Sequence, residues 1–475
     1  MKNTRVFMEY FQRNLERLRT NFILFPVVKQ NRAILFHIPT LSIYEIDENY
    51  KNFFEFLLNT SAEKFKTMFT EYISKDKENY KIIKDIFTTI KEVEKMAEKI
   101  KDISAQRLSQ LTLLVSQRCT MDCLYCYAKG GTYGQNHLMN AEVVKKSILV
   151  FYKLYDSIEK IKFFGGEPLL NIRGILSAIY LLRELHQKGF IKKFPVIEVV
   201  TGLGVEEEII GCLIKMVMEN TGFNFEILVS MDGPEDIQNL LRPMKGGKPS
   251  FEIVDKNLRM LRKINQPKMI GVTFTKKHLE MGFTEEVLIE FFHMNYGIDT
   301  VKIEPVITDK PELEVPKNYI NDDIYEVFTK ISKGNIKVLN DPEDIRIRIR
   351  TIVNKIISSF PKKYFCDAGI TSFAVTAIGD VYPCYIVAGN GQYLITNVNE
   401  PVETIRQKLK ETIKNYRKLS DKDQHGKCKK CYLRYFCNAC TFETIIKDKE
   451  KYFADCKKRR DIVRIVFENE LWRKI

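Results

Sequence analysis

Long apolar runs are missing from this 475-residue sequence. No run of about 18 apolar residues occurs, so the sequence predicts no transmembrane helix. Residues 1–20 also lack the apolar segment and cleavage site of a signal peptide. We therefore expect a cytoplasmic protein without a membrane partner. Structural disulfides are rare in that compartment, and clustered cysteines there more often bind metal or take part in chemistry.

A long run of charge of one sign is missing as well. The 75 Lys and Arg residues are spread among 61 Asp and Glu residues, and the net charge is +14. Nucleic-acid-binding domains gather their basic residues on one face or along one helix, so we do not expect a nucleic-acid partner. With 45% hydrophobic and 11% aromatic residues, the composition is that of a soluble globular protein. The length suggests roughly two to four domains.

The first group of cysteines has no fourth member. Within "QRCTMDCLYCYAKGG" (residues 117–131) lie Cys119, Cys123 and Cys126. Three thiolates leave one iron of a four-iron cluster without a protein ligand, and a small molecule can bind there. Structural zinc is the alternative, but such sites use four ligands, and no histidine precedes His137 in this stretch.

Strand-like and helix-like segments alternate after residue 110. The predicted strands are 111–117, 161–165, 196–201, 225–230, 269–275 and 301–306. This alternation favours an α/β fold, a partial (β/α)6 TIM-like barrel, with functional residues at the C-terminal ends of its strands. Before it, residues 21–49 read as two or three short strands and residues 50–105 as helices, which indicates a small mixed domain.

The C-terminal part holds seven of the eleven cysteines. Paired CxxC units of zinc ribbons are typically about 12–20 residues apart, whereas only residues 432–436 separate the two pairs here. Seven thiolates therefore fit two clusters better than one zinc site. The remaining Cys212 lies in the apolar stretch "IIGCLIKMVM", for which we expect a buried helix. There a buried structural thiol is the first expectation and a distant cluster ligand the alternative.

The first cysteine group, with Tyr125 before its last cysteine, resembles the CxxxCxxC signature of radical S-adenosylmethionine (SAM) enzymes. The resemblance implies that SAM chelates the open iron and that its one-electron cleavage gives a 5′-deoxyadenosyl radical, which abstracts a substrate hydrogen. "GGEP" and "SMDGP" with a following arginine resemble further elements of that family. They imply SAM contacts by Gly165, Gly166, Glu167, Ser230, Asp232 and Arg242. "VVTGLG" (199–204) lacks the Asn that many relatives carry at this position. For residues 230–242, the alternative to SAM contacts is an Asp-Gly turn followed by a surface arginine.

The cysteine-rich tail resembles the SPASM domain of radical SAM peptide-modifying enzymes, including "GDVYPC" at 379–384. The resemblance implies an outer cluster on Cys428, Cys431, Cys437 and Cys456 and an inner one on Cys366, Cys384 and Cys440. With the SAM-binding cluster, this makes three 4Fe–4S clusters. Many relatives have an eighth cysteine, but none occurs in 367–383. An open inner cluster would offer an iron to a substrate thiolate; water, an Asp or another cysteine in that position is the alternative.

The order of elements in the N-terminal region resembles the RiPP recognition element, a winged-helix-like fold that binds the leader of a ribosomally made precursor peptide. The resemblance as a whole is to the six-cysteine (SCIFF, or ranthipeptide) and sactipeptide maturases, which form thioether bonds. It implies four consecutive parts: 1–105 for leader binding, 106–310 for the barrel, 311–365 as a bridge and 366–475 for SPASM. The expected partners are a Cys-rich precursor peptide and an electron donor such as flavodoxin or ferredoxin.

Other functions stay open at this point. A related enzyme could form carbon–carbon crosslinks, epimerise residues or oxidise Ser or Cys to formylglycine, as sulfatase maturases do. A non-catalytic electron carrier or peptide-binding scaffold would not need the 230–242 element. An RNA-modifying radical SAM enzyme would not need the SPASM-like tail. No side chain is assigned as a catalytic acid or base.

Overall fold

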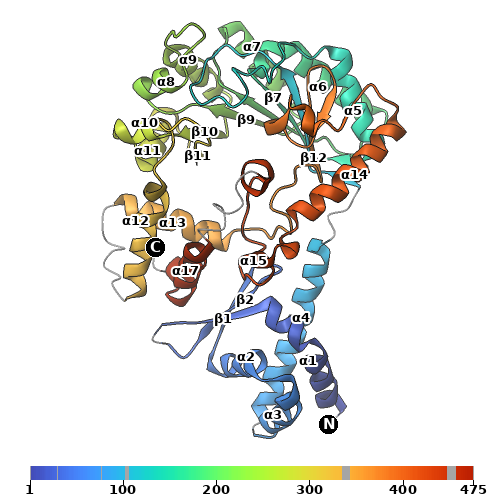
Figure 1. Ribbon diagram of the computed structural model, residues 1–475, viewed down its shortest axis with the longest axis vertical. Helices are drawn as coiled ribbons and strands as arrows, with labels where there is room; N and C mark the ends of the chain where they lie inside the picture. Colours follow the sequence, from blue (N-terminus) through green and yellow to red (C-terminus); the bar gives the residue numbers. More distant parts are fainter. Residues whose placement is uncertain are drawn as a thin grey trace. The chain divides into compact units, whose positions relative to one another are not determined.

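The computed structural model describes residues 2–28, 30–75, 77–101, 106–333, 343–446 and 456–473. It divides into two compact units, each built from distant segments (Figure 1). The first combines residues 1–103, 318–366 and 419–475, and the second 104–317 and 367–418. The four consecutive parts expected above stay a prediction, and the boundary after residue 105 adjoins residues 102–105, which lie outside the described ranges.

A largely parallel sheet forms the centre of the second unit. Its order is β11-β10-β9-β8-β7-β5-β12-β13-β14. The strands are β5 (Gln110–Ser116), β7 (Lys160–Gly165), β8 (Val196–Thr201), β9 (Phe225–Ser230), β10 (Met269–Phe274), β11 (Val301–Pro305), β12 (Ser372–Val375), β13 (Asp380–Tyr382) and β14 (Thr396–Asn397). The first six match the six predicted strands and pair in parallel, so the predicted α/β fold is confirmed. β12 extends the sheet in parallel beside β5, and β13 and β14 follow as antiparallel strands.

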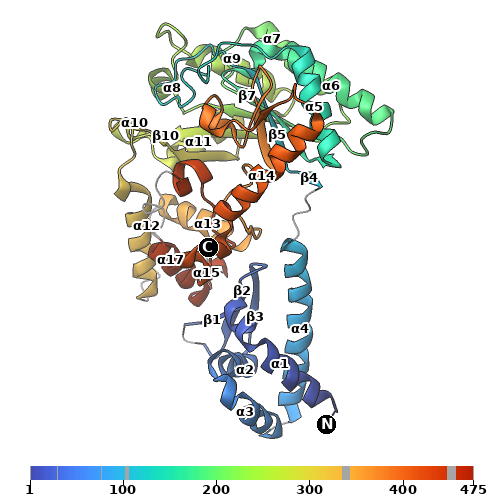
Figure 2. The ribbon, with the colours of Figure 1, turned by 45° about the vertical axis from the view of Figure 1, so that its right-hand side comes forward.

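Helices lie along the outside of this sheet, and all but α14 connect its strands (Figure 2). They are α5 (Ala141–Leu154), α6 (Ile172–Gln187), α7 (Glu207–Glu219), α8 (Glu235–Leu241), α9 (Phe251–Arg262), α10 (Lys276–Glu280), α11 (Glu285–Tyr296) and α14 (Val402–Ser420). Local sequence sets their ends: the Asn140 side chain accepts the Val143 N–H at the start of α5, and Gly297 ends α11 in the left-handed conformation. A short parallel pair joins β4 (Arg107–Leu108) to β6 (Ser157–Ile158).

The first unit starts with a helix that the sequence did not lead us to expect, α1 (Lys2–Asn21). It is followed by a three-stranded antiparallel sheet in the order β1-β2-β3 and by three helices. These are β1 (Phe22–Pro26), β2 (Ala33–His37), β3 (Ser42–Ile46), α2 (Glu48–Asn59), α3 (Ala62–Lys75) and α4 (Lys77–Lys101). The predicted order of strands and then helices is confirmed.

C-terminal segments belong to this first unit. They are α12 (Lys317–Ser332), α13 (Glu343–Ile357), α15 (Gly426–Lys429), the π-helix η6 (Thr441–Ile446) and α17 (Cys456–Glu468). Among them, α12, α13 and α17 contribute to its core. Phe467 of α17 packs against Phe25 and Phe36, with ring centroids 5.1 and 5.4 Å apart. The N-terminal sheet and the cysteine-rich tail therefore share one apolar core.

Two expectations about helices can be compared with the structure. No helix of the described residues is long and apolar enough to cross a membrane. Residues 207–219 form α7 as expected, but Cys212 is exposed, so the expectation of a buried thiol was wrong. Ile210, Leu213 and Met216 occupy the buried face of α7, and the helical period turns Cys212 away from it.

Candidate SAM and iron–sulfur site

The first three cysteines lie on the loop that follows β5. The Cys126 N–H donates to the Cys123 carbonyl at 3.1 Å, and the Met121 N–H donates to Cys119 Sγ at 3.5 Å. Cys119 and Cys123 interact electrostatically, as do Cys123 and Cys126. The loop thus gathers the three thiols at the C-terminal end of a barrel strand, where the sequence placed the site.

Burial raises the pKa of the Cys119 thiol to about 12, with the nearby Glu167 carboxylate acting in the same direction. Burial also raises the pKa of Cys123, while Arg242 opposes the increase. Metals bind thiolates and deprotonate the thiols that coordinate them, so the positive charge of bound metal would balance the thiolate charge that burial disfavours in this loop. Among the described residues, no three His, Cys, Asp or Glu side chains converge around a single metal ion. Thiolates of a four-iron cluster bind separate irons and need no such convergence.

Glycines bring the end of β7 against the cysteine loop. A Cβ on Gly131 would lie 2.5 Å from the Gly166 Cα and 2.8 Å from the Cys119 Cβ. A Cβ on Gly166 would lie 2.6 Å from the Arg118 carbonyl carbon, and Gly165 has a φ of +134°. Only glycine allows this approach, which explains the Gly-Gly pair of "GGEP".

Glu167 connects β7 to β8. Its carboxylate accepts the Thr201 hydroxyl at 2.8 Å, the Gly202 N–H at 2.9 Å and the Leu169 N–H at 3.0 Å. The residue is 2% exposed, and burial raises its pKa. Thr201 and Gly202 belong to the "VVTGLG" segment that lacks the family's Asn, so their part in holding Glu167 was missed. A hydroxyl followed by glycine at a strand end was the available signal.

A buried network links Tyr125, Asp232 and Arg242. The Tyr125 hydroxyl donates to Asp232 Oδ2 at 2.5 Å and accepts from Arg242 Nη1 at 2.8 Å. Burial raises the Tyr125 pKa well above its usual range, so this phenol stays protonated. Arg242 is 8% exposed and interacts electrostatically with Cys123, so it is no surface arginine.

The Asp232 carboxylate is fixed by the next strand. Its Oδ1 accepts the Thr273 N–H of β10 at 3.0 Å. The His278 Nδ1 accepts the Thr275 N–H, which leaves Nε2–H to donate to the Asp232 carbonyl at 3.0 Å. Burial lowers the His278 pKa and favours this neutral form. The sequence did not point to Thr273 or His278.

Two buried polar groups without a partner and two closely packed glycines lie beside these residues. Arg242 Nε and Thr120 Oγ1 are buried without a hydrogen-bond partner in the described part of the chain. A Cβ on Gly202 would lie 3.2 Å from Arg242 Nη2, and one on Gly204 3.2 Å from Thr120 Oγ1. Ser230 is half-buried at the end of β9. A buried guanidinium with a free N–H, next to three thiols, fits a carboxylate-bearing ligand such as SAM.

Four C-terminal cysteines also lie together. Each of Cys428, Cys437 and Cys456 interacts electrostatically with Cys431, and Cys428 and Cys437 both interact with Cys456. Burial raises the pKa of Cys428 to about 11. These four are the residues expected to hold the outer cluster, and the first unit gathers them within one small region.

The three cysteines of the expected inner cluster belong to different units. Cys384 follows β13 in the second unit, and Cys366 and Cys440 belong to the first. The Cys366 N–H donates to Ser420 Oγ at 3.2 Å. The inner cluster stays a prediction.

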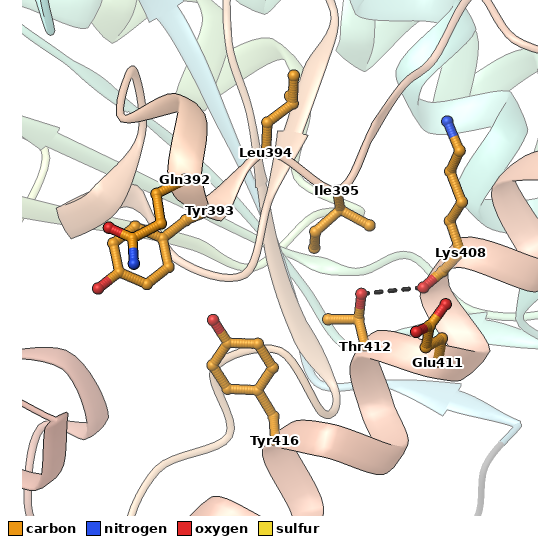
Figure 3. A pocket seen from close by; sticks show the side chains of 8 residues that line it. All are labelled: Gln392, Tyr393, Leu394, Ile395, Lys408, Glu411, Thr412 and Tyr416. Carbon is orange, nitrogen blue, oxygen red and sulfur yellow. Dashed lines mark hydrogen bonds between the residues drawn. The ribbon is translucent and has the colours of Figure 1, made fainter.

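A pocket of about 250 Å3 lies next to the Cys384 segment (Figure 3). Residues 392–395 line one side and α14 the other, and the Thr412 hydroxyl donates to the Lys408 carbonyl at 2.9 Å. Burial, with Tyr393 and Cys384 nearby, raises the pKa of Tyr416 to about 12. Tyr393 and Tyr416 extend toward the pocket from opposite sides.

Two family models match the chain. The radical SAM superfamily matches residues 113–281, and the iron–sulfur cluster-binding SPASM domain matches residues 366–432. The chain therefore contains a radical SAM domain, followed in the sequence by a SPASM domain. It is a radical SAM enzyme, and its cofactors are SAM and iron–sulfur clusters. The matches include the first three cysteines and, among the later ones, Cys366, Cys384, Cys428 and Cys431.

Known proteins resemble most of the chain. An uncharacterised protein of Methanocaldococcus jannaschii is 27% identical over 284 residues, which are 59% of this chain and 86% of the relative. A cysteine-type anaerobic sulfatase-maturating enzyme of Clostridium perfringens is 24% identical over 346 residues, 68% of this chain and 86% of the relative. Structures of anSMEcpe, with bound AdoMet and with AdoMet plus a Cp18Cys peptide, have TM-scores of 0.56 and 0.54 at 19% and 17% identity. Both cover 76% of this chain and 97% of theirs, and at this identity they show a shared fold.

Proposed function

We propose that this enzyme modifies a ribosomally synthesised, Cys-rich precursor peptide and joins cysteine sulfur to carbon in thioether bonds. It would hold three 4Fe–4S clusters, one for SAM and two in the SPASM region. The observation that carries the proposal is the position of Cys384. The buried Tyr133 interacts electrostatically with both Cys126 and Cys384, so an expected ligand of the inner cluster and an expected ligand of the SAM-binding cluster lie near the same side chain within one unit.

At the first site, Cys119, Cys123 and Cys126 would bind three irons of a cluster, and the open iron would bind SAM. SAM supplies, after one-electron cleavage, the radical that removes a substrate hydrogen. Arg242 would hold the SAM carboxylate with its unused N–H, since Tyr125 already occupies Nη1. The glycines at 165 and 166 would let the backbone approach the SAM amino group. Glu167 would keep the ends of β7 and β8 together.

At the inner site, a substrate cysteine would take the ligand position for which residues 367–383 offer no cysteine. A peptide thiolate held there would combine with a substrate carbon radical made with SAM. Joining the two removes one hydrogen atom from carbon and one proton from the thiol. One electron remains, and an auxiliary cluster would accept it. An external flavodoxin or ferredoxin would supply the electron that starts each turnover.

The N-terminal sheet would bind the leader of the peptide as an added strand. β3 pairs with β2 on one side and forms one edge of the sheet. The other edge is less accessible, because the Val28 N–H just after β1 donates to the Glu468 carbonyl at 2.8 Å. Backbone hydrogen bonds along a free edge give affinity in this mode of peptide recognition.

A second candidate is oxidation of a Cys or Ser side chain to formylglycine. The match to a cysteine-type sulfatase-maturating enzyme over 86% of its length favours it. This reaction also removes hydrogen from a peptide side chain, but it forms an aldehyde and consumes the residue.

Mass spectrometry separates the two reactions. A Cys-rich peptide encoded beside the gene would be incubated anaerobically with enzyme, SAM and reductant, then alkylated. We expect the loss of two hydrogens per crosslink together with the loss of alkylatable thiols. The same mass loss with every thiol still alkylated would contradict thioether formation and indicate a carbon–carbon bond. A product that reacts with an aldehyde probe would indicate formylglycine.

A further inference from the structure

The helix α14 borders a second cavity, for which the proposed function has no use. The cavity measures about 630 Å3, and every residue that lines it belongs to the second unit. Its walls come from the end of α5, from the two residues before β12 and from one face of α14. The lining residues of α14, which we call the α14 patch, are Arg406, Leu409, Lys410, Ile413, Lys414 and Arg417.

The charge of the α14 patch has one sign. Among the described residues, the lining of the cavity includes four cations and no Asp or Glu. Arg406 pairs with Glu403 at 3.2 Å, whereas Lys410, Lys414 and Arg417 pair with no carboxylate of the described ranges. Arg417 Nε is also buried without a hydrogen-bond partner there. Cations three or four residues apart on one helix repel each other, so this arrangement favours a partner with negative charge.

The centre of the cavity is apolar and its edge is charged. Leu409 is buried, as are Tyr155 and Ile370 on the other walls, whereas Lys410 and Lys414 are exposed. Protein–protein interfaces have this anatomy, with an apolar core and a polar rim. Nucleic acid or a small anion would bind the cations and leave the apolar residues uncovered, so the surface fits an acidic protein. The α14 patch is only about 16 Å long, which suits the small interfaces of electron-transfer complexes.

The α14 patch lies beside Cys384, an expected ligand of the inner cluster. Arg417 directly follows Tyr416, which interacts electrostatically with Cys384. Gly369 lies against the same tyrosine, since a Cβ on Gly369 would lie 2.7 Å from the Tyr416 ring and 3.1 Å from the Pro383 Cβ. Residues next to the cavity therefore pack closely against the segment that carries Cys384. A protein docked on the α14 patch would be close to the inner cluster.

The cavity also lies at the opposite ends of the strands from the SAM site. Thr371 lines it just before β12, and β12 starts beside Gln110 at the start of β5. The SAM-binding cysteines follow the other end of β5. A peptide that loses hydrogen must lie at that other end, whereas an electron carrier needs only to approach a cluster. The position therefore favours a carrier over the substrate peptide.

We propose that the α14 patch docks an acidic electron carrier, a small protein of the flavodoxin or ferredoxin type. The inference rests on the proposed function, in which an auxiliary cluster takes up one electron for each crosslink. That electron would pass from the reduced inner cluster to the oxidised carrier, and no bond forms or breaks in this step. The cations would attract the carrier and orient it, and the apolar residues would hold it.

The test is anaerobic surface plasmon resonance of the reconstituted full-length enzyme with the flavodoxin and the ferredoxin encoded in the same genome. The double variant Lys410→Gln, Lys414→Gln removes two exposed charges from the α14 patch. The matched control is Lys145→Gln, Lys408→Gln, which removes two exposed charges elsewhere in the second unit and leaves the same net charge. We expect the patch variant to lower the association rate of a carrier roughly tenfold, and added salt to reduce the difference. The control should bind as the wild type does.

Three results would overturn the proposal. Neither carrier binds the wild-type enzyme, or the patch variant and the control bind a carrier equally well. In the third result, the patch variant binds both carriers normally but loses binding of the precursor peptide, which would assign the surface to the peptide. A patch variant that unfolds at lower denaturant than the control would contradict the repulsion among its cations.

Crosslink formation driven by a chemical reductant keeps this test separate from the proposed function, because it needs no carrier. Both double variants should form crosslinks at the wild-type rate under these conditions. Normal crosslinks without carrier binding would overturn only the role of the α14 patch. Carrier binding without crosslinks in the wild-type enzyme would contradict the proposed function and leave the docking surface standing.

Discussion

Replacing Gly166 by alanine is expected to separate the end of β7 from the cysteine loop. The added Cβ would lie 2.6 Å from the Arg118 carbonyl carbon, closer still to its oxygen, and 3.0 Å from the Gly131 oxygen. All three are backbone atoms, so no side chain can rotate away to make room. The Arg118 oxygen also accepts the Glu167 N–H at 2.7 Å, and this bond would be disturbed.

The expected cost follows from these contacts. Overpacking a tight site costs about 1–3 kcal/mol, and a lost backbone hydrogen bond costs about 0.5–1.5 kcal/mol. Together they predict that Gly166→Ala lowers the free energy of unfolding by about 1.5–4.5 kcal/mol. The matched control is Gly211→Ala, on the exposed side of α7, where the new Cβ meets nothing within 4 Å. Ala in a helix is about 0.5–1 kcal/mol more favourable than Gly, so this change should stabilise the protein.

Anaerobic guanidinium denaturation followed by circular dichroism measures both variants, and equilibrium dialysis with labelled SAM measures binding. We expect the denaturation midpoint to move down for Gly166→Ala and up for Gly211→Ala, with weakened SAM binding in the first only. A Gly166→Ala protein that is as stable as the wild type and binds SAM equally well would refute the close approach of the two loops.

Three further changes test other parts of the site. Tyr125→Phe removes the hydroxyl that bonds to Asp232 and Arg242, and leaves these two buried side chains each short of a hydrogen bond. We therefore expect weaker SAM binding, and a denaturant titration should show a free energy of unfolding lower by about 1–3 kcal/mol. Asn257→Ala removes two buried hydrogen bonds, at 2.9 and 2.7 Å, to the loop after β8. The midpoint of thermal unfolding should therefore fall. An unchanged midpoint would contradict the expectation that Asn257 stabilises this loop. The pKa of Glu198 is lowered, because the charges of Lys162 and Lys160 outweigh the opposite effect of burial. The ionised Glu198 therefore stabilises the folded protein at pH values above its usual pKa of 4.5, and this contribution is lost as the pH falls below that value. Glu198→Gln should therefore flatten the acid limb of a stability–pH curve, and an identical limb would contradict the pairing.

The barrel could be predicted from the sequence because its signals are local. Each strand is a short apolar run bounded by turn residues, and six such runs alternating with helices leave few other folds. The Gly-Gly-Glu and Ser-Met-Asp segments each follow a strand, so their meeting at one end of the sheet followed from the parallel order. The helix α1 was missed, although its apolar residues Phe7, Phe11, Leu15 and Leu18 recur at helical spacing and are buried.

Contacts between distant segments could not be predicted in this way. The hydrogen bond between Tyr125 and Asp232 joins residues far apart in the chain. Neither residue type indicates from the sequence which partner it will have. Cys212 shows the opposite error, since an apolar stretch suggested burial while the helical period turned this one residue outward. Lys422 is fully buried, and the sequence gave no signal of this, because a lysine is normally exposed.

The central claim is that Cys119, Cys123 and Cys126 hold the cluster at which SAM is cleaved. The most direct measurement is the formation of 5′-deoxyadenosine from SAM and reductant under anaerobic conditions, quantified by liquid chromatography. We expect Cys123→Ala to abolish it, and Cys212→Ala, which removes an exposed thiol outside every expected cluster, to leave it unchanged. Formation of 5′-deoxyadenosine at the wild-type rate by Cys123→Ala would contradict the account.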